Sequence, residues 1–351
     1  MFRILVLIIG LSIPSLANGE DFSPEMQKCF ATLDRWQNAE ATTCFLLVAY
    51  TPDKVGATEN DVVEANYRLY ELSLIMRLGH KVAIQHLEYA AKSGHPAAQN
   101  HLSYLITTTY GSKPNKAINE ALGSRYSLRD AHNLLKAASD AGYYPAMIKL
   151  AADYRNGTGG ALKDPVYAQE LELKGVELAL GAANAGDAEA AEDLSRYAIR
   201  GIGMPESMEQ MKFYEDMAYR IYEARAESGS IKTKRFLAIR YSGIRPPEND
   251  QERARAEYWA LSYLSAAQDY DAATMVAGLY GEEKFGSGPG PKTIAHILYN
   301  YASTLDDGDF AARQRDEIAA ELTKSQTDTA LRVARLCVDD GIPACIQQLP
   351  R

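Results

Sequence analysis

The chain has 351 residues with 37 Lys or Arg against 46 Asp or Glu, so its formal net charge is −9 at pH 7. This acidic balance argues against nucleic acid or anionic lipid as a general partner. Four cysteines, an even number, fit disulfide pairing in an oxidising compartment. Alanine and leucine are abundant and strand-like alternation is scarce, which favours an all-α fold.

The first residues have the pattern of a secretory signal peptide. Arg3 precedes an apolar run over residues 4–13, and Ser15 and Ala17 supply the small residues that a signal peptidase needs. We expect cleavage after Ala17, with Asn18 as the first mature residue. The apolar run is shorter than the ~20 residues of a membrane-spanning helix. The expected product is a soluble, exported, periplasmic protein that does not insert into the membrane after cleavage.

Two helices are predicted next, over residues 23–38 and 39–50. Ser23 is suited to cap the first of them, and Pro24 is suited to its first turn. A turn near Asn38 separates the two.

From residue 90 onward a short phrase recurs around a glycine. Its copies are AAKSGHPAAQNHL (90–102), ASDAGYYPAMIKL (138–150), AANAGDAEAAEDL (182–194), the weaker RAESGSIKTKRFL (225–237), and degenerate copies at 266–274 and 304–312. In the first three copies an alanine lies four residues before and four residues after the glycine, and a leucine follows eight residues after it. The turn centres are therefore residues 94, 142, 186, 229, 270, 308 and 341, where Tyr270 replaces glycine. This spacing predicts a repeat architecture.

Each phrase predicts a helical hairpin. Glycine ends one helix in the left-handed conformation at little cost, and the next helix starts two or three residues later. Small residues on both sides let two antiparallel backbones approach closely. A second set of turns, at 154–165, 197–207 and 241–251, separates a first helix from a second one within each repeat.

The pattern resembles the Sel1-like repeat of the tetratricopeptide-like superfamily. The residues that carry the match are Leu150, Tyr154, Gly157, Gly159, Asp164, Ala168, Ala182, Ala183 and Gly186. The resemblance implies a right-handed α-solenoid of helix-turn-helix repeats over 79–321, between an N-terminal helical cap over 18–78 and a C-terminal hairpin cap over 322–351. The sequence departs from the family in longer second helices after Asp164 and Gly203, an expanded 110–126 loop and decayed last copies.

The cysteines fit this frame. Cys337 and Cys345 lie four residues before and after Gly341, where other copies have alanine, so we expect a disulfide across the last hairpin. Cysteine-rich Sel1-like proteins carry the same Cys-x7-Cys. Cys29 and Cys44 are expected to join the first two helices in a similar way. Pairing between the two ends is the alternative, and it would require the ends of an elongated solenoid to meet.

No motif indicates an enzyme, a cofactor or a metal site. Residues 286–293 resemble a phosphate-binding loop, but Pro291 replaces the required glycine. The histidines lack the spacing of metal ligands and are expected at surfaces or helix interfaces; they are His80, His86, His95, His101, His132 and His296.

One helix is basic in an otherwise acidic protein. Within residues 230–243 four cations occur without an acid, and three tyrosines, Tyr197, Tyr241 and Tyr280, are expected nearby. The candidate binding set comprises Lys232, Lys234, Arg235, Arg240, Tyr197 and Tyr241. First helices of such solenoids usually line the concave surface. The alternative is that the tyrosines occupy the packing position of the family and the cations balance acidic neighbours.

The resemblance therefore implies a secreted or periplasmic scaffold that binds another protein, such as a secreted toxin or an envelope component. Its role would be that of an adaptor, an envelope regulator or a toxin-neutralising immunity protein. The alternative is a β-lactam-binding or hydrolysing enzyme of the cysteine-rich Sel1-like type, for which the sequence offers no serine–lysine or zinc constellation.

Overall fold

The computed structural model describes residues 22–35, 37–111, 115–243, 249–286, 289–306 and 309–350. All regular secondary structure in these ranges is helical, which confirms the predicted all-α fold class. The predicted signal peptide (1–17) and the turn centre at residue 308 lie outside the described residues.

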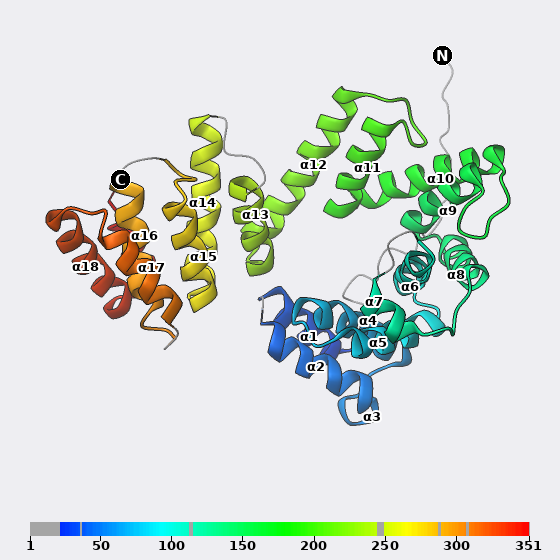
Figure 1. Cartoon of the computed structure of the whole chain (residues 1–351), viewed down its shortest axis with the longest axis horizontal. Coiled ribbons are helices and arrows are strands. Elements are labelled where there is room, and N and C mark those ends of the chain that lie inside the picture. The colour runs from blue at the N-terminus through cyan, green and yellow to red at the C-terminus, as the bar shows by residue number, and fades with distance from the viewer. Residues whose placement is uncertain are drawn as a thin grey trace, which may run out of the picture. The chain divides into compact units, whose positions relative to one another are not determined.

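The helices follow one another with short connections (Figure 1). Their bounds are α1 Pro24–Asp34, α2 Asn38–Tyr50, α3 Pro52–Val55, α4 Glu59–Ile75, α5 His80–Lys92, α6 Pro96–Thr109, α7 Lys116–Leu122, α8 Leu128–Asp140, α9 Tyr144–Asn156, α10 Pro165–Asn184, α11 Ala188–Arg200, α12 Met208–Glu227, α13 Ile231–Gly243, α14 Asp250–Ala267, α15 Tyr270–Gly281, α16 Pro289–Ala302, α17 Asp309–Ala319, α18 Lys324–Asp339 and α19 Ile342–Gln347.

Packing divides the protein into two compact units. Apart from residues 34–36, the first unit extends to Ile221 and the second begins at Tyr222, so the division falls inside α12. Successive helices pack as neighbours within each unit, for example α9 with α10 in the first and α15 with α16 in the second (Figure 1). The first unit begins with a core cluster on α1, α2 and α4 that includes Met26, Phe45 and Leu72.

The repeated glycines close the hairpins as the sequence predicts. Gly94, Gly142, Gly186 and Gly229 all have positive φ, between 84° and 113°. The residue after each glycine donates its N–H to the carbonyl four residues before the glycine: His95 to Ala90, Tyr143 to Ala138, Asp187 to Ala182 and Ser230 to Arg225, over 3.0–3.2 Å. This bond closes the end of the first helix. The next helix then starts two residues after the glycine in all four hairpins.

The small residues beside the turns are packed as expected. Ala90, Ala98, Ala138, Ala146 and Ala190 have no exposed surface. Ala182 is half-buried, and its neighbour Ala183 takes the buried place instead. The leucines eight residues after the turns are buried in all four copies; they are Leu102, Leu150, Leu194 and Leu237.

The predicted turn centre at Tyr270 is wrong by two residues. Gln268, with φ +52°, is the residue that adopts the left-handed conformation, and Tyr270 is already the first residue of α15. Asp269 explains the shift, because its side chain accepts the N–H of Ala272 and caps the new helix. Glutamine tolerates this conformation poorly compared with glycine, so no residue type marks the true centre.

The departures from the repeat have simple structural forms. α10 and α12 each have 20 residues, whereas α9 and α11 have 13, so the second helices are long as predicted. The expanded 110–126 loop contains a short helix, α7, which buries Leu122.

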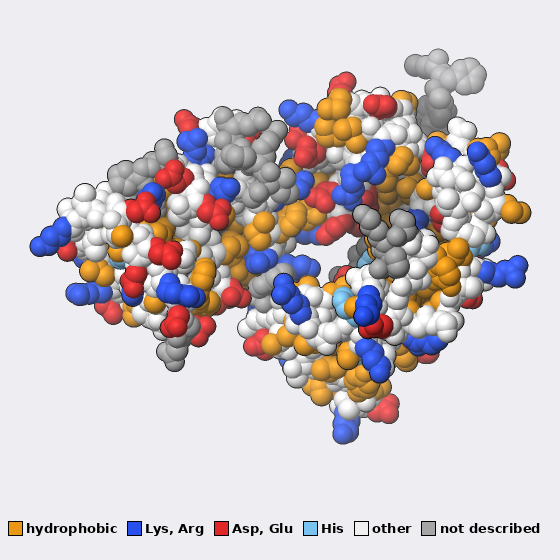
Figure 2. All heavy atoms as spheres, in the orientation of Figure 1, with side chains coloured by type: hydrophobic (Ala, Val, Ile, Leu, Met, Phe, Trp, Pro, Cys, Tyr) orange, Lys and Arg blue, Asp and Glu red, His pale blue; other side chains and the backbone are white. Residues whose placement is uncertain are grey.

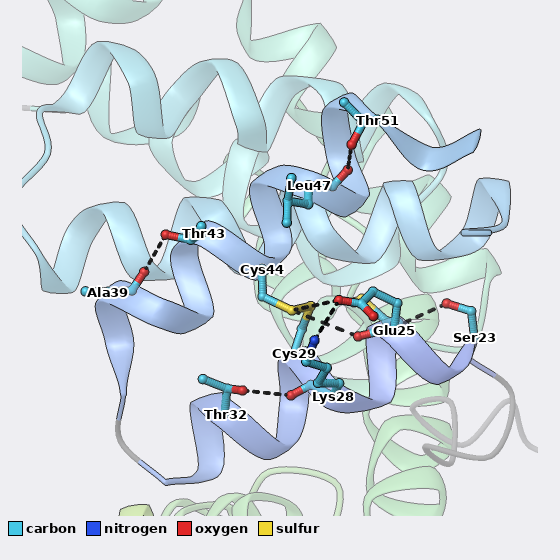
Figure 3. Close-up of a disulfide and its surroundings, with 11 residues drawn as sticks. Ser23, Glu25, Lys28, Cys29, Thr32, Ala39, Thr43, Cys44, Leu47 and Thr51 are labelled. Carbon is cyan, nitrogen blue, oxygen red and sulfur yellow. Dashed lines mark hydrogen bonds and ion pairs between the residues drawn. A yellow bond between two sulfur atoms is a disulfide. The ribbon is translucent and has the colours of Figure 1, made fainter. Parts of the chain in front are cut away.

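Both predicted disulfides are present. Cys29 and Cys44 join α1 to α2 with Cα atoms 5.4 Å apart, and Cys337 and Cys345 join α18 to α19 with Cα atoms 4.7 Å apart. Figure 3 shows the first bond between the two helices, with Glu25 and Lys28 beside it on α1. At the second bond, α19 starts directly after Gly341, one residue sooner than in the four glycine hairpins above. The last hairpin therefore has a shorter turn than these four and a covalent tie.

Replacing Cys337 and Cys345 together with alanine should lower the free energy of unfolding by about 2 to 3 kcal/mol, because the bond restricts the unfolded state. Helical content should be kept, since alanine occupies the equivalent places in other hairpins. Urea unfolding followed by circular dichroism measures both quantities. Loss of the folded state would contradict the equivalence of these cysteines with the alanines.

Replacement by alanine should have a different effect on stability at a turn glycine than at a glycine inside a helix. Gly94→Ala should destabilise by about 1 to 2 kcal/mol, because φ is +91° although a Cβ would meet no atom within 4 Å. Gly278→Ala, inside α15, is the matched control and should be neutral or stabilising by up to about 1 kcal/mol. Thermal unfolding of both variants would test this. Equal effects would show that backbone conformation at the turn is not limiting.

Candidate functional site

The candidate binding residues lie on two helices. Five of them are on α13, where the Lys232 side chain is exposed and those of Lys234, Arg235, Arg240 and Tyr241 are half-buried. Tyr197 lies on α11 in the first unit and is only 7% exposed. The structure thus brings together the α13 residues, and Tyr197 belongs to a different helix and unit.

Tyr241 takes part in a polar cluster that ties α12, α13 and α14 together. Its hydroxyl donates to Oε1 of Glu223 over 2.9 Å, and the Arg255 guanidinium pairs with the same carboxylate and lies 5.2 Å from the centre of the Tyr241 ring. Trp259 also donates to Glu223, over 3.4 Å. Tyr241 therefore has a packing role, which is the alternative that the sequence left open.

The equivalent tyrosine of the next repeat is used in the same way. The Tyr280 hydroxyl donates to Glu257 on α14 over 2.6 Å, and only 1% of this residue is exposed. Tyr280 follows the turn at Gln268 by the same 12 residues that separate Tyr241 from Gly229. In both repeats the first helix is thus anchored by its last tyrosine to a glutamate of a second helix.

Arg235 has acidic and aromatic neighbours in the second unit. Burial raises the pKa of Tyr263 to about 12, and Asp269 and Asp271 raise it too, whereas the Arg235 guanidinium opposes them. Arg235 is therefore close to Tyr263 and balances nearby acids. On the face shown in Figure 2, acidic and basic side chains are interspersed over α14 to α18 rather than gathered by sign.

A second polar cluster, which the sequence did not single out, joins α4 to α6 in the first unit. Arg68 lies 2.7 Å from both Glu64 and Glu71, and His95 bonds to Glu64 over 2.8 Å. The Tyr67 ring stacks on His95 with ring centres 4.4 Å apart. The spacing of Glu64, Arg68 and Glu71 on one helix is the signal that predicts their ion pairs.

Burial and neighbouring charges shift the pKa values of Glu64 and His101 in this cluster. Burial would raise the pKa of Glu64, but the hydrogen bond from His95 and the charge of Arg68 outweigh it, so the pKa lies below its ordinary value. His101, which bonds through Nδ1 to the Tyr67 hydroxyl over 3.2 Å, has a pKa lowered by burial. Near pH 7 the Glu64 carboxylate is therefore ionised and His101 is neutral.

Exposed apolar side chains form a row on α10 that the sequence reasoning also missed. Val166, Leu173 and Leu180 are spaced by seven residues and are 70%, 54% and 38% exposed. Further along the first unit, Met208 and Phe213 on α12 are 64% and 56% exposed. Figure 2 shows hydrophobic side chains gathered where α12 begins. Seven-residue spacing on one helix was the available signal, because it places side chains on a single face.

Neither a metal cluster nor a membrane span is found in the part of the protein that the structure describes. No three or more His, Cys, Asp or Glu side chains there are placed to hold a metal ion. None of the helices described has the length and apolar composition needed to span a bilayer.

Of three comparisons with known proteins, the comparison with solved structures is the one that finds similar proteins. Neither the protein-family models nor the curated proteins contain a match. One similar structure is a protective antigen of uropathogenic Escherichia coli strains displaying an SLR fold; it has 14% identity and a TM-score of 0.31, and the match covers 94% of this chain and 96% of that one. Another is a Sel1 repeat protein from Oxalobacter formigenes, with 20% identity and a TM-score of 0.28, where the match covers 66% of this chain and 94% of that one. These structural neighbours are Sel1-repeat proteins, the class that the repeated phrase resembles.

Acidification should destabilise the protein from about pH 6.5 downward. Burial lowers the pKa of His86, His101 and His296 below the ordinary 6.5, so the unfolded state takes up protons before the folded state does. The contribution of these three histidines to the free energy of unfolding is therefore complete above pH 6.5. It is lost as the pH falls toward their pKa values in the folded state. The urea midpoint at pH 7.5 should exceed that at pH 5.5, and His101→Gln should reduce the difference. A midpoint independent of pH would contradict the burial of these histidines.

Proposed function

We propose that the protein is an exported, periplasmic scaffold that binds another protein through its helical repeats. The observation that carries the proposal is the row of Val166, Leu173 and Leu180. These side chains are on α10, a helix of 20 residues that packs against α9, and they remain 70%, 54% and 38% exposed. An apolar row of this kind is costly in water unless a partner covers it.

The exported location rests on the predicted signal peptide and on the two disulfides, which favour an oxidising compartment. Within this class, the role is that of an adaptor, an envelope regulator or an immunity protein that neutralises a secreted toxin. The domain plan is a helical cap over 18–78, an array over 79–321 and a terminal hairpin over 322–351.

The direct test is affinity capture of the tagged mature protein from cross-linked envelope extract, with partners identified by mass spectrometry. A stoichiometric secreted hydrolase or toxin would indicate an immunity protein, and a receptor or export component would indicate a regulator or adaptor. Absence of any protein above background, under several extraction conditions, would remove the support for a scaffold.

The apolar row provides the variant for this test. Leu173→Lys should reduce capture of the partner at least tenfold, because a cation on the row cannot be buried in an apolar interface. Its melting temperature should be unchanged, since Leu173 is 54% exposed. Leu331→Lys is the matched control, because Leu331 is 42% exposed on α18 in the second unit. Equal capture by both variants would exclude α10 from the interface.

The basic helix α13 is the second surface in the proposal. Lys232→Glu with Lys234→Glu reverses two charges without disturbing Arg235, which lies close to Tyr263. A loss of capture relative to Lys324→Glu on α18 would place the partner on α13. Unchanged capture would remove Lys232 and Lys234 from the site.

A further inference from the structure

Lys149 on α9 has a buried amine whose Nζ has no hydrogen-bond or ion-pair partner among the residues that the structure describes. Asp153 lies one turn further along α9, but its carboxylate accepts the Thr158 hydroxyl over 2.9 Å. Burial lowers the pKa of Lys149 to about 8, with Asp153 opposing the shift, so the amine is still mostly protonated at pH 7. The structure therefore keeps a positive charge out of water without a direct hydrogen bond or ion pair, and Asp153 acts on it only at longer range.

Such a charge lowers stability unless a ligand compensates it. Burying an ionised group without a partner is among the most costly changes in a protein interior. A lysine usually avoids the cost by extending its amine to the surface, and a methionine of similar length would avoid it altogether. An anion that binds to the folded protein and pairs with the Lys149 ammonium would remove this cost, which gives the buried lysine a function.

The surroundings show how an anion could reach the amine. Tyr104 on α6 lies over it, with Nζ 5.2 Å from the ring centre, and Tyr104 is itself 55% exposed. Exposed side chains change rotamer within nanoseconds, so rotation of this ring would uncover Nζ at little cost. The cation–π contact between Lys149 and Tyr104 can then be replaced by an anion, since such contacts contribute only about 0.5 to 2 kcal/mol.

The neighbouring groups restrict the charge of the ligand. His101 precedes Tyr104 by three residues on α6, and its pKa is lowered by burial, with Lys149 contributing. His101 is thus neutral at pH 7. Arg68 on α4 is already paired with Glu64 and Glu71. The Asp153 carboxylate already lies within electrostatic range of Lys149. A ligand with a single negative charge therefore fits this position better than a phosphate dianion, which would place a second charge beside Asp153.

We propose that Lys149 receives a carboxylate of a polypeptide partner in the first unit, with Tyr104 as its movable cover. This inference rests on the proposed protein-binding function and adds the chemistry of one contact. The carboxylate belongs either to an Asp or Glu side group or to the free C-terminus of the partner.

Two peptide libraries displayed on phage distinguish these sources when selected against the whole mature protein. One library is fused through its C-terminus and offers only the carboxylates of Asp and Glu, and the other ends in a free C-terminus. Peptides selected on the wild type should carry an acid at a fixed position or require the free C-terminus. They should bind Lys149→Met at least tenfold more weakly, and they should bind Lys174→Met, an exposed lysine on α10, as they bind the wild type.

A stability measurement decides the inference without any partner. Lys149→Met should raise the urea midpoint, because it removes a buried charge that has no direct ion-pair partner, whereas a structural lysine would lower the midpoint when replaced. A lower midpoint, selected peptides without an acid, equal binding to Lys149→Met, or no selected peptide from either library would each overturn the carboxylate site. If envelope capture still yields a partner in that case, the scaffold function stands and this contact alone fails.

Discussion

The structure depends on one local constraint, the closure of helical hairpins such as those at Gly94, Gly142, Gly186 and Gly229 at a residue with positive φ. The glycine reverses the backbone, and the N–H after it returns to a carbonyl four residues before it, so the direction of the second helix is set by backbone geometry. Alanines such as Ala138 and Ala146 then allow close contact, and leucines such as Leu150 fill the space further along. Side-chain packing builds on an arrangement that the turn has already fixed.

Much of this could be predicted because the constraint requires few residue types. Glycine with alanine four residues on either side identifies the hairpins, and the same rule locates the Cys337–Cys345 bond. The rule failed at Gln268, because a non-glycine residue adopts the left-handed conformation there and the capping Asp269 decides where α15 starts. Sequence spacing alone does not show which residue will accept that backbone cost.

The candidate site was less predictable because its interactions join residues far apart in the sequence. The sequence leaves Tyr241 open between a binding and a packing role, and only the arrangement of α12 and α14 shows that Glu223 and Arg255 contact it. The unpaired state of Lys149 is also invisible in the sequence, where Asp153 one turn later suggests an ordinary ion pair. Partner choice depends on side-chain direction, which the repeat pattern does not encode. The apolar row on α10, by contrast, could have been predicted from the sequence, because its three residues are spaced by seven.

Hairpins that close through their own turns also have a consequence for folding kinetics. The contacts that close a hairpin join residues near in sequence, so little loop entropy must be lost before they form. A protein with such local contacts folds quickly and tends to open one segment at a time rather than as a whole. The last hairpin differs, because the Cys337–Cys345 bond keeps its two helices connected even when their packing is lost. Local unfolding of α18 and α19 therefore leaves a segment whose helices cannot separate, which limits how far a protease can open this hairpin.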